Sequence, residues 1–197
     1  MNVVCLDLEG VLVPEIWISL AEATGVEDLR LTTRDISDYD RLMQHRLEIL
    51  DRHQIHLSQI QAVIAALHPL PGAEQFLRSL RRRYQVIILS DTFYQFADPL
   101  MVQLQRPTLF CHDLVVTDDR IIGYRLRRPD AKRHAVAALQ ELNFRVLAAG
   151  DSYNDVPMLQ QAHFGVLFDP PQRVAEEYPE LPVAQGFEQL MALFDGA

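Results

Sequence analysis

Short apolar runs recur along the chain and predict the strands of a sheet. Each run is rich in Val, Leu and Ile without polar alternation, which is typical of strands buried on both faces of a parallel sheet. Five runs have this pattern, beginning at Val3 and lying at Gln85–Leu89, Thr108–Cys111, Arg145–Ala149 and Phe164–Phe168. Two further runs, Leu114–Thr117 and Ile121–Leu126, flank the polar residues 118–120 and predict a hairpin.

Segments with apolar residues at three- and four-residue steps predict helices. They lie at residues 14–23, 35–52, 60–67, 73–80, 95–104, 131–142 and 187–194, and one more starts at Asp155. After residue 70 these helices alternate with the strands. That alternation is typical of an α/β fold with a doubly wound, mainly parallel, Rossmann-like sheet, here of five strands.

A helical block interrupts the alternation directly after the first strand. It covers residues 14–70 and ends at the helix-breaking stretch Pro69-Leu70-Pro71-Gly72. Ligands of doubly wound sheets bind outside the carboxyl ends of the strands. We therefore expect an α/β core of residues 1–13 and 71–197, with a small helical cap domain of residues 14–70 that overhangs those strand ends.

The overall composition narrows the class of protein. The chain has 197 residues, 49% of them hydrophobic, and a formal net charge of -9. That charge argues against non-specific nucleic-acid binding, which depends on basic surface. No apolar run approaches the ~18 residues of a membrane span, and no basic segment precedes an apolar one at the N-terminus. We expect a soluble cytoplasmic protein without nucleic-acid or membrane partners.

Two acidic residues follow the first strand. Asp7 and Glu9 are two positions apart, so they point to the same side of an extended chain. Neighbouring carboxylates repel each other and resist removal from water. Either these are solvated residues at the end of a strand, or a cation lies between them.

Polar groups also stand at later strand and helix ends. The second strand is followed by Ser90-Asp91-Thr92, and the strand at Arg145–Ala149 by Gly150-Asp151-Ser152-Tyr153-Asn154-Asp155. Between them, Lys132 lies in the first turn of a predicted helix, with Asp130 as the expected N-cap. Lys132 is the only lysine in the chain, beside seventeen arginines. Either it is there by chance, or its position needs a compact ammonium rather than a planar guanidinium.

Together these motifs resemble those of the haloacid dehalogenase-like phosphohydrolases. The matching residues, in the family's order, are Asp7-Leu8-Glu9-Gly10-Val11, Ser90, Lys132 and Gly150-Asp151-Ser152-Tyr153-Asn154-Asp155. The resemblance covers the full chain, including a helical cap after the first motif as in the phosphoserine phosphatases. The stretches Asp7–Glu15 and Leu89–Phe93 are most similar to a bacterial group that hydrolyses phosphoserine and also transfers its phosphate to homoserine.

A divalent cation is expected at these acidic residues. A bound phosphomonoester adds about two negative charges to a site where Lys132 supplies one positive charge. Unit charges 4 Å apart interact by about 4 kcal/mol at an effective dielectric of 20, so repulsion would prevent binding. Clustered carboxylates favour Mg²⁺. The resemblance implies that Asp7, the backbone carbonyl of Glu9 and Asp151 hold the metal, and that Asp155 orders its waters.

The resemblance also implies catalytic roles. Asp7 attacks phosphorus to give an aspartyl-phosphate, and Ser90 and Lys132 bind the phosphate oxygens. Glu9 protonates the leaving oxygen and then activates the acceptor. The family pattern has Asp at the position of Glu9, so the efficiency of hydrolysis is open.

The same resemblance suggests how a substrate is held. Arg46 matches the position that binds the substrate carboxylate, and Glu15 lies within one residue of the acid that binds the substrate amine. Asp91, Thr92 and Asn154 complete the expected substrate-binding set. The expected partners are phosphoserine and, as acceptor, homoserine.

Other interpretations remain open at this stage. The enzyme can act on a different small phosphomonoester. A signalling receiver domain also combines Asp, Mg²⁺, Ser or Thr and Lys on a doubly wound sheet, but it lacks a helical block after the first strand. A binding module that has lost its activity is the third alternative. The sequence does not decide between a monomer and a homodimer.

Overall fold

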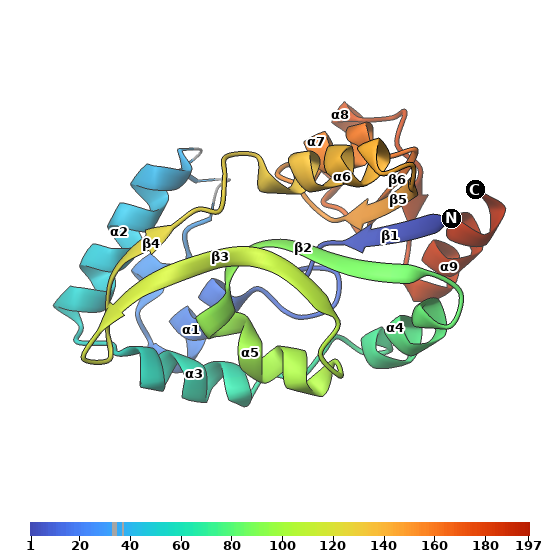
Figure 1. Cartoon of the computed structure of the whole chain (residues 1–197). Helices are drawn as coiled ribbons and strands as arrows, with labels where there is room; N and C mark the ends of the chain where they lie inside the picture. The colour runs from blue at the N-terminus through green and yellow to red at the C-terminus, as the bar shows by residue number, and fades with distance from the viewer. Residues whose placement is uncertain (33–34, 37) are drawn as a thin grey trace.

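The structure, a computed structural model, describes residues 1–32, 35–36 and 38–197. Its strands form one sheet, with the described strands in the order β4-β3-β2-β1-β5-β6-β7 (Figure 1). Their bounds are β1 (Asn2–Leu6), β2 (Gln85–Phe93), β3 (Thr108–Thr117), β4 (Arg120–Arg125), β5 (Arg145–Gly150), β6 (Phe164–Phe168) and β7 (Val183–Ala184). Neighbouring strands are parallel except for the antiparallel pair β3 and β4. The predicted α/β, doubly wound, mainly parallel fold is confirmed.

The sheet differs from the prediction in its number of strands. Seven strands are present in the described chain, where five and a hairpin were expected. The runs Thr108–Cys111 and Leu114–Thr117 belong to a single strand, β3, because the polar pair His112-Asp113 interrupts the apolar pattern but not the extended backbone. Strand β7 has only two residues, which is too short to leave a periodic pattern.

Helices connect the strands much as the sequence predicts. Their bounds are α1 (Ile16–Thr24), η1 (Glu27–Arg30), α2 (Tyr39–Arg52), α3 (Leu57–Ala65), α4 (Ala73–Arg81), α5 (Tyr94–Gln103), α6 (Ala131–Glu141), α7 (Val156–Gln161), α8 (Gln172–Glu177) and α9 (Phe187–Gly196). The helix expected from Asp35 begins at Tyr39, after the N-cap Asp38, whose carboxylate accepts a hydrogen bond from the Arg41 N–H. Ser37, inside the predicted range, is outside the described residues. None of the helices described is long and apolar enough to cross a bilayer.

Alternate residues of β1 enter two different apolar cores. Val3 and Cys5 pack with residues of α6, α7 and α8, whereas Val4 and Leu6 pack with residues of α4 and α9. Figure 1 shows these two groups of helices on opposite faces of the sheet. Since both faces are covered, both sets of side chains are apolar, which explains the continuous apolar runs.

Helix α3, between β1 and α4 in the chain, is hydrogen-bonded to the hairpin of β3 and β4. At the hairpin turn, the Asp119 carbonyl accepts a hydrogen bond from the Leu57 N–H at 2.9 Å, and its carboxylate accepts one from the Ser58 N–H at 2.9 Å. These contacts satisfy N–H groups at the start of α3 that have no partner inside the helix. One apolar cluster also runs from α1 into the core, where Trp17 packs edge-on against Phe96. The division into core and cap domains therefore stays a prediction.

We expect Gly165→Ala to destabilise the protein. Gly165 lies in β6, and a Cβ there would be 2.3 Å from the backbone carbonyl oxygen of Leu159 in α7. Overpacking of this kind costs about 1–3 kcal/mol. Equilibrium unfolding in urea measures the loss, with Gly196→Ala as the matched control because a Cβ at Gly196 meets nothing within 4 Å. Equal free energies of unfolding for the two variants would contradict this expectation.

Candidate active site

The sequence motifs meet at the carboxyl ends of the central strands. Asp7 follows β1, Asp151 follows β5, and Lys132 lies in the first turn of α6. Strands β1 and β5 are neighbours, and the Asp7 N–H extends their pairing by donating to the Ala149 carbonyl at 2.9 Å. At β1 the strand order reverses, with β2 on one side and β5 on the other. Doubly wound folds bind their ligands at this switch point.

Strand β2 brings Ser90, Asp91 and Thr92 to the same edge. The strand continues to Phe93, beyond the predicted end at Leu89, but its pairing with β3 is irregular between these two residues. Irregularities of this kind redirect side chains and are common beside active sites. Ser90 and Thr92 are buried, and the Thr92 N–H donates to the Ser90 hydroxyl oxygen at 3.2 Å.

The ammonium of Lys132 is surrounded by carboxylates. Its Nζ lies 2.7 Å from Oδ1 of Asp155, 2.8 Å from Oδ1 of Asp7 and 3.6 Å from Oδ2 of Asp91. Burial works against a charge on Lys132, but these three acids outweigh it and hold the pKa of Lys132 well above its usual range. A charged and buried ammonium is therefore fixed among three strand-end acids.

Three acids form a cluster that fits a metal ion. Ligand oxygens of Asp7, Asp151 and Asp155 all lie within 4.8 Å of one another. Burial and the charges of Asp155 and Asp151 raise the pKa of Asp7 well above its usual range, although Lys132 lowers it. One ammonium does not balance three buried carboxylates, and an all-oxygen donor set suits Mg²⁺. The residues present therefore fit the expected cation.

Two details of the backbone shape this cluster. Gly10 has a φ of +78°, and a Cβ there would lie 2.5 Å from Cγ of Asp151, so only glycine leaves room for that carboxylate. Oδ2 of Asp155 accepts hydrogen bonds from the N–H groups of Asp151 at 3.1 Å and Ser152 at 3.2 Å. Because its other oxygen is bound to Lys132, Asp155 fixes both the loop after β5 and the ammonium.

Glu9 has different neighbours from Asp7. Its Oε2 accepts a hydrogen bond at 2.9 Å from the N–H of Ile16, the first residue of α1. Burial and the charge of Glu15 raise the pKa of Glu9 to about 7, against the lowering effects of the Ile16 N–H, the Thr92 side chain and Arg46. Each acid therefore has its own neighbouring cation. The charge of Lys132 acts on Asp7, and the charge of Arg46 acts on Glu9.

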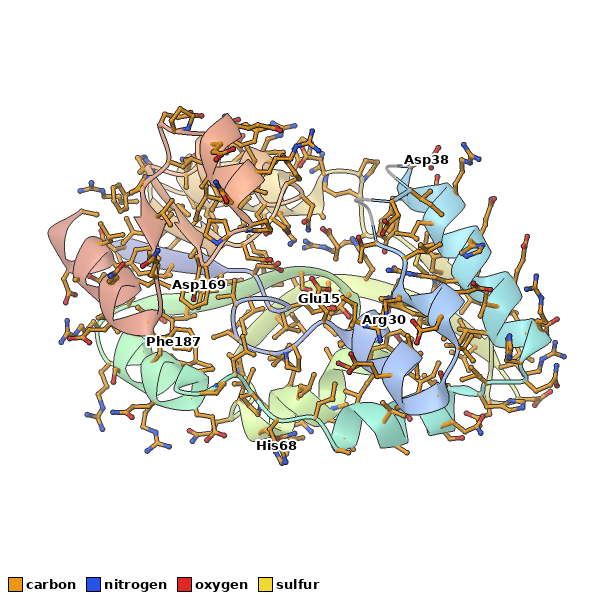
Figure 2. The ribbon with its side chains drawn as sticks, turned by 180° about the vertical axis from the view of Figure 1, so that it is seen from behind. Glu15, Arg30, Asp38, His68, Asp169 and Phe187 are labelled. Carbon is orange, nitrogen blue, oxygen red and sulfur yellow. The ribbon has the colours of Figure 1, made fainter. Side chains whose placement is uncertain are left out.

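Arg46, in α2, is a buried cation at the cap side of the site. Its guanidinium lies 4.4 Å from the centre of the Trp17 ring, and Nη2 donates to the Leu31 carbonyl at 2.9 Å. Among the described residues, no hydrogen-bond partner is present for its buried Nε. Burial lowers the pKa of Arg46 to about 10, although Tyr39, Glu9 and Glu15 raise it. Figure 2 shows Glu15 on the segment leading into α1, between the sheet and the cap helices.

The remaining predicted site residues bind one another around Lys132. Nδ2 of Asn154 donates to Oδ2 of Asp91 at 3.1 Å, and the Tyr39 hydroxyl donates to the Asp91 carbonyl at 3.2 Å. The second contact joins helix α2 to strand β2. Asp91 therefore links the ammonium, the loop after β5 and helix α2.

The structure corrects one predicted contact and adds one residue. Asp130 stands at the N-cap position of α6, but its backbone is left-handed, with φ +49°, and its side chain makes no capping hydrogen bond. It pairs with Arg133 instead. His112, which the sequence analysis missed, is buried beside Asp91, with its Nε2 3.6 Å from Oδ1 of that residue. The only signal in the sequence was a histidine inside the apolar run of β3.

Comparisons with known proteins agree on one family. A family model described as haloacid dehalogenase-like hydrolase matches residues 1–163. Phosphoserine phosphatase ThrH of Pseudomonas aeruginosa is 56% identical over 195 residues, covering 98% of this chain and 95% of that protein. A phosphoserine phosphatase of Pseudomonas syringae pv. tomato is 55% identical over 195 residues, covering 98% of this chain and 82% of that protein.

Solved structures share the fold. An apo phosphoserine phosphatase superposes with a TM-score of 0.76 at 19% identity, covering 93% of each chain. A phospho-aspartyl intermediate analogue of phosphoserine phosphatase gives a TM-score of 0.76 at 18% identity, covering 98% of this chain and 97% of the other. At such low identities the similarity concerns the fold alone.

We expect Gly10→Ala to weaken Mg²⁺ binding roughly 10- to 100-fold, the loss typical when a residue that supports a metal ligand is changed. The added Cβ would displace the Asp151 carboxylate. Isothermal titration with MgCl₂ measures the affinity. Gly25→Ala is the matched control, because Gly25 also has a positive φ, +70°, but a Cβ there meets nothing within 4 Å. Equal affinities in the two variants would show that this carboxylate is not needed for the cation.

Proposed function

The chain belongs to the haloacid dehalogenase-like hydrolase family, as its motifs predicted, and on that premise we propose that it is a Mg²⁺-dependent phosphoserine phosphatase. The observation that carries the proposal is the pair of buried cations beside Asp7 and Glu9. Lys132 suits a phosphate, and Arg46 suits a carboxylate. The Pseudomonas relatives, 56% and 55% identical to this chain, are named phosphoserine phosphatases.

In the first chemical step, Asp7 attacks phosphorus. A bond forms between a carboxylate oxygen of Asp7 and phosphorus, and the bond from phosphorus to the serine oxygen breaks. Glu9 gives its proton to that oxygen, so serine leaves as the neutral alcohol. A pKa of about 7 leaves a protonated fraction of Glu9 available for this step near neutral pH. Lys132 and Ser90 bind the equatorial phosphate oxygens, where negative charge collects.

In the second step, Glu9 removes a proton from the acceptor. The acceptor oxygen then bonds to phosphorus while the aspartyl-phosphate bond breaks, which restores the Asp7 carboxylate. Water as acceptor gives inorganic phosphate. Asp7, the backbone carbonyl of Glu9 and Asp151 would hold Mg²⁺, which neutralises charge on the phosphoryl oxygens when bound. Asp155 keeps Lys132 and the loop after β5 in place.

The cap side of the site suits the amino-acid part of the substrate. Arg46 pairs with the substrate carboxylate, and Glu15 pairs with its ammonium. Trp17 and the Sδ of Met43, 3.8 Å from Nη1 of Arg46, frame the guanidinium and keep water from it. Asp91, Thr92 and Asn154 line the approach between the two halves and fix Lys132 and Glu9.

Homoserine is a second acceptor under this proposal. It differs from serine by one methylene, a difference typically worth only ~1–3 kcal/mol of discrimination. A site that releases serine from Asp7 can therefore admit homoserine and return phosphohomoserine. Membership of the hydrolase family favours this enzymatic function over a receiver-like phosphoacceptor or an inactive binding module. A cytoplasmic location and a homodimer stay predictions.

We expect the purified protein to release serine from phosphoserine in Mg²⁺ and to stop when EDTA removes the cation. Asp7→Asn should abolish turnover, because the amide is not a nucleophile. The matched control is Asp98→Asn on the exposed surface of α5, which should keep full activity. Mass spectrometry after an acid quench should find phosphate on the Asp7 peptide. Phosphate on Ser90 or on a histidine would contradict the mechanism.

The same assay measures transfer. Serine, free phosphate and phosphohomoserine are followed together while homoserine is raised. With transfer, free phosphate falls below serine, and phosphohomoserine makes up the difference. Equal serine and free phosphate at every homoserine concentration would leave a phosphatase without transfer, and hydrolysis of other phosphomonoesters alone would leave a different substrate.

We expect Arg46→Met to remove the preference for a substrate carboxylate. Methionine keeps the apolar stem beside Trp17 but loses the charge, and a hydrogen bond to a charged group is worth about 1.5–3 kcal/mol. The KM for phosphoserine should therefore rise roughly 10- to 100-fold. Phosphoethanolamine, which lacks the carboxylate, is the matched substrate, and its kinetics should change little. A parallel loss for both substrates would assign Arg46 to packing instead.

A further inference from the structure

His112, which lies behind Asp91 as seen from Lys132, has no role in the chemistry described above. The imidazole of His112, in β3, is buried, with 3% of the residue exposed, and its nearest ring neighbour is Phe93 at 6.5 Å between ring centres. Nε2 of His112 lies 3.6 Å from Oδ1 of Asp91, and Oδ2 of Asp91 lies 3.6 Å from Nζ of Lys132. Buried polar side chains in native structures have a hydrogen-bonding reason to be there.

The backbone fixes which nitrogen of His112 carries the proton. Nδ1 lies 3.1 Å from the backbone nitrogen of Arg127, which can only donate a hydrogen bond. Nδ1 therefore accepts, and the single proton of the neutral ring is on Nε2. That N–H faces the Asp91 carboxylate. The imidazole is thus bound to a fixed backbone donor on one side, and its Nε2–H is directed at the Asp91 carboxylate 3.6 Å away on the other.

Asp91 depends on its partners for its position. Its side chain is 35% exposed, so burial alone does not fix its rotamer. Burial raises the pKa of Asp91, but Lys132, His112 and Asn154 outweigh this and lower it, so the group stays a carboxylate. Asn154 binds the oxygen that faces Lys132 at 3.1 Å, and His112 faces the other oxygen. Together they aim one carboxylate oxygen at the ammonium.

The contact between Asp91 and Lys132 gains importance during turnover. In the structure, Lys132 is closer to Asp7 and Asp155 than to Asp91. Under the proposed function, Asp7 becomes esterified to phosphate and stops being a carboxylate. Asp155 and Asp91 are then the protein acids left to place the ammonium against the phosphoryl oxygens. An Asp91 side chain free to rotate would leave Lys132 held from one side.

We propose that His112 is a positioning residue, which acts through Asp91 to hold the ammonium of Lys132 in place for phosphoryl transfer. The proposal rests on the proposed function for the reaction itself, but the position of Lys132 can be measured without any substrate. It adds to the site a residue that touches neither the substrate nor the expected cation.

The test uses His112→Phe, Asp91→Asn and the double variant. Phenylalanine keeps the ring shape but can neither donate to Asp91 nor accept from Arg127. His163→Phe is the matched control: Nδ1 of His163 also accepts a backbone N–H, from Val146 at 3.1 Å, but His163 precedes β6 at the end of the sheet away from the site. Both histidine variants therefore lose the same kind of backbone hydrogen bond.

The first readout needs no turnover. Because Lys132 is the only lysine in the chain, labelling with [¹³Cε]lysine gives one Cε resonance for the native sequence. His112→Phe and Asp91→Asn should shift or broaden that resonance, whereas His163→Phe should leave it unchanged. The double variant should match Asp91→Asn. An unchanged resonance in His112→Phe would overturn the proposal.

The second readout is the kinetics with phosphoserine. His112→Phe should lower kcat roughly two- to tenfold, less than the loss of a full hydrogen bond to a charged group because the contact with Asp91 is 3.6 Å long, and change KM less than twofold, since the Arg46 end is untouched. The double variant should be no slower than Asp91→Asn. Multiplicative losses in kcat would overturn action through Asp91. A wild-type protein that leaves phosphoserine intact, while the resonance still shifts in His112→Phe, would count against the proposed function and leave the positioning role supported.

Discussion

The site depends on one buried ammonium. Lys132 draws together Asp7 and Asp155, which follow β1 and β5, and Asp91 of β2. Asp7 and Asp155 are buried, so their charges would be costly without this partner. This arrangement also determines the balance of charge in the site. Three carboxylates of Asp7, Asp151 and Asp155 come together beside one ammonium, and their oxygens fit the divalent cation of the proposed function.

A second buried cation gives the site two ends. Arg46, in α2, has Glu9 and Glu15 as charged neighbours, whereas Lys132, in α6, lies beside Asp7. Under the proposed function, the phosphate of the substrate binds at the Lys132 end and its amino-acid part at the Arg46 end. The two ends are joined by Thr92, which contacts Glu9, and by Tyr39, whose hydroxyl reaches the Asp91 carbonyl. Helix α2 and strand β2 are therefore connected through residues of the site itself.

Glu9, where the family pattern has Asp, makes a contact with the first helix of the chain. Its carboxylate reaches the first N–H of α1, so the proposed acid and base is bound to the helix that begins the cap. The positive end of a helix stabilises a carboxylate, while burial disfavours its charge. Burial together with the charge of Glu15 prevails, and the pKa of Glu9 is raised to about 7.

The sequence by itself determined the layered fold and indicated residues that the structure brings close together. Strands buried on both faces leave unbroken apolar runs. Asp7 and Asp151 directly follow two of these runs, Ser90 follows the apolar part of a third, and Lys132 is the only lysine in the chain, so these residues were recognisable without coordinates. Features set by distant contacts were not. The tautomer of His112 depends on the Arg127 backbone, the side chain of Asp130 turns to Arg133, and β7 exists only because β6 pairs with it. Local pattern records which faces are buried, whereas the partner of each polar group is decided by residues brought together only when the chain folds.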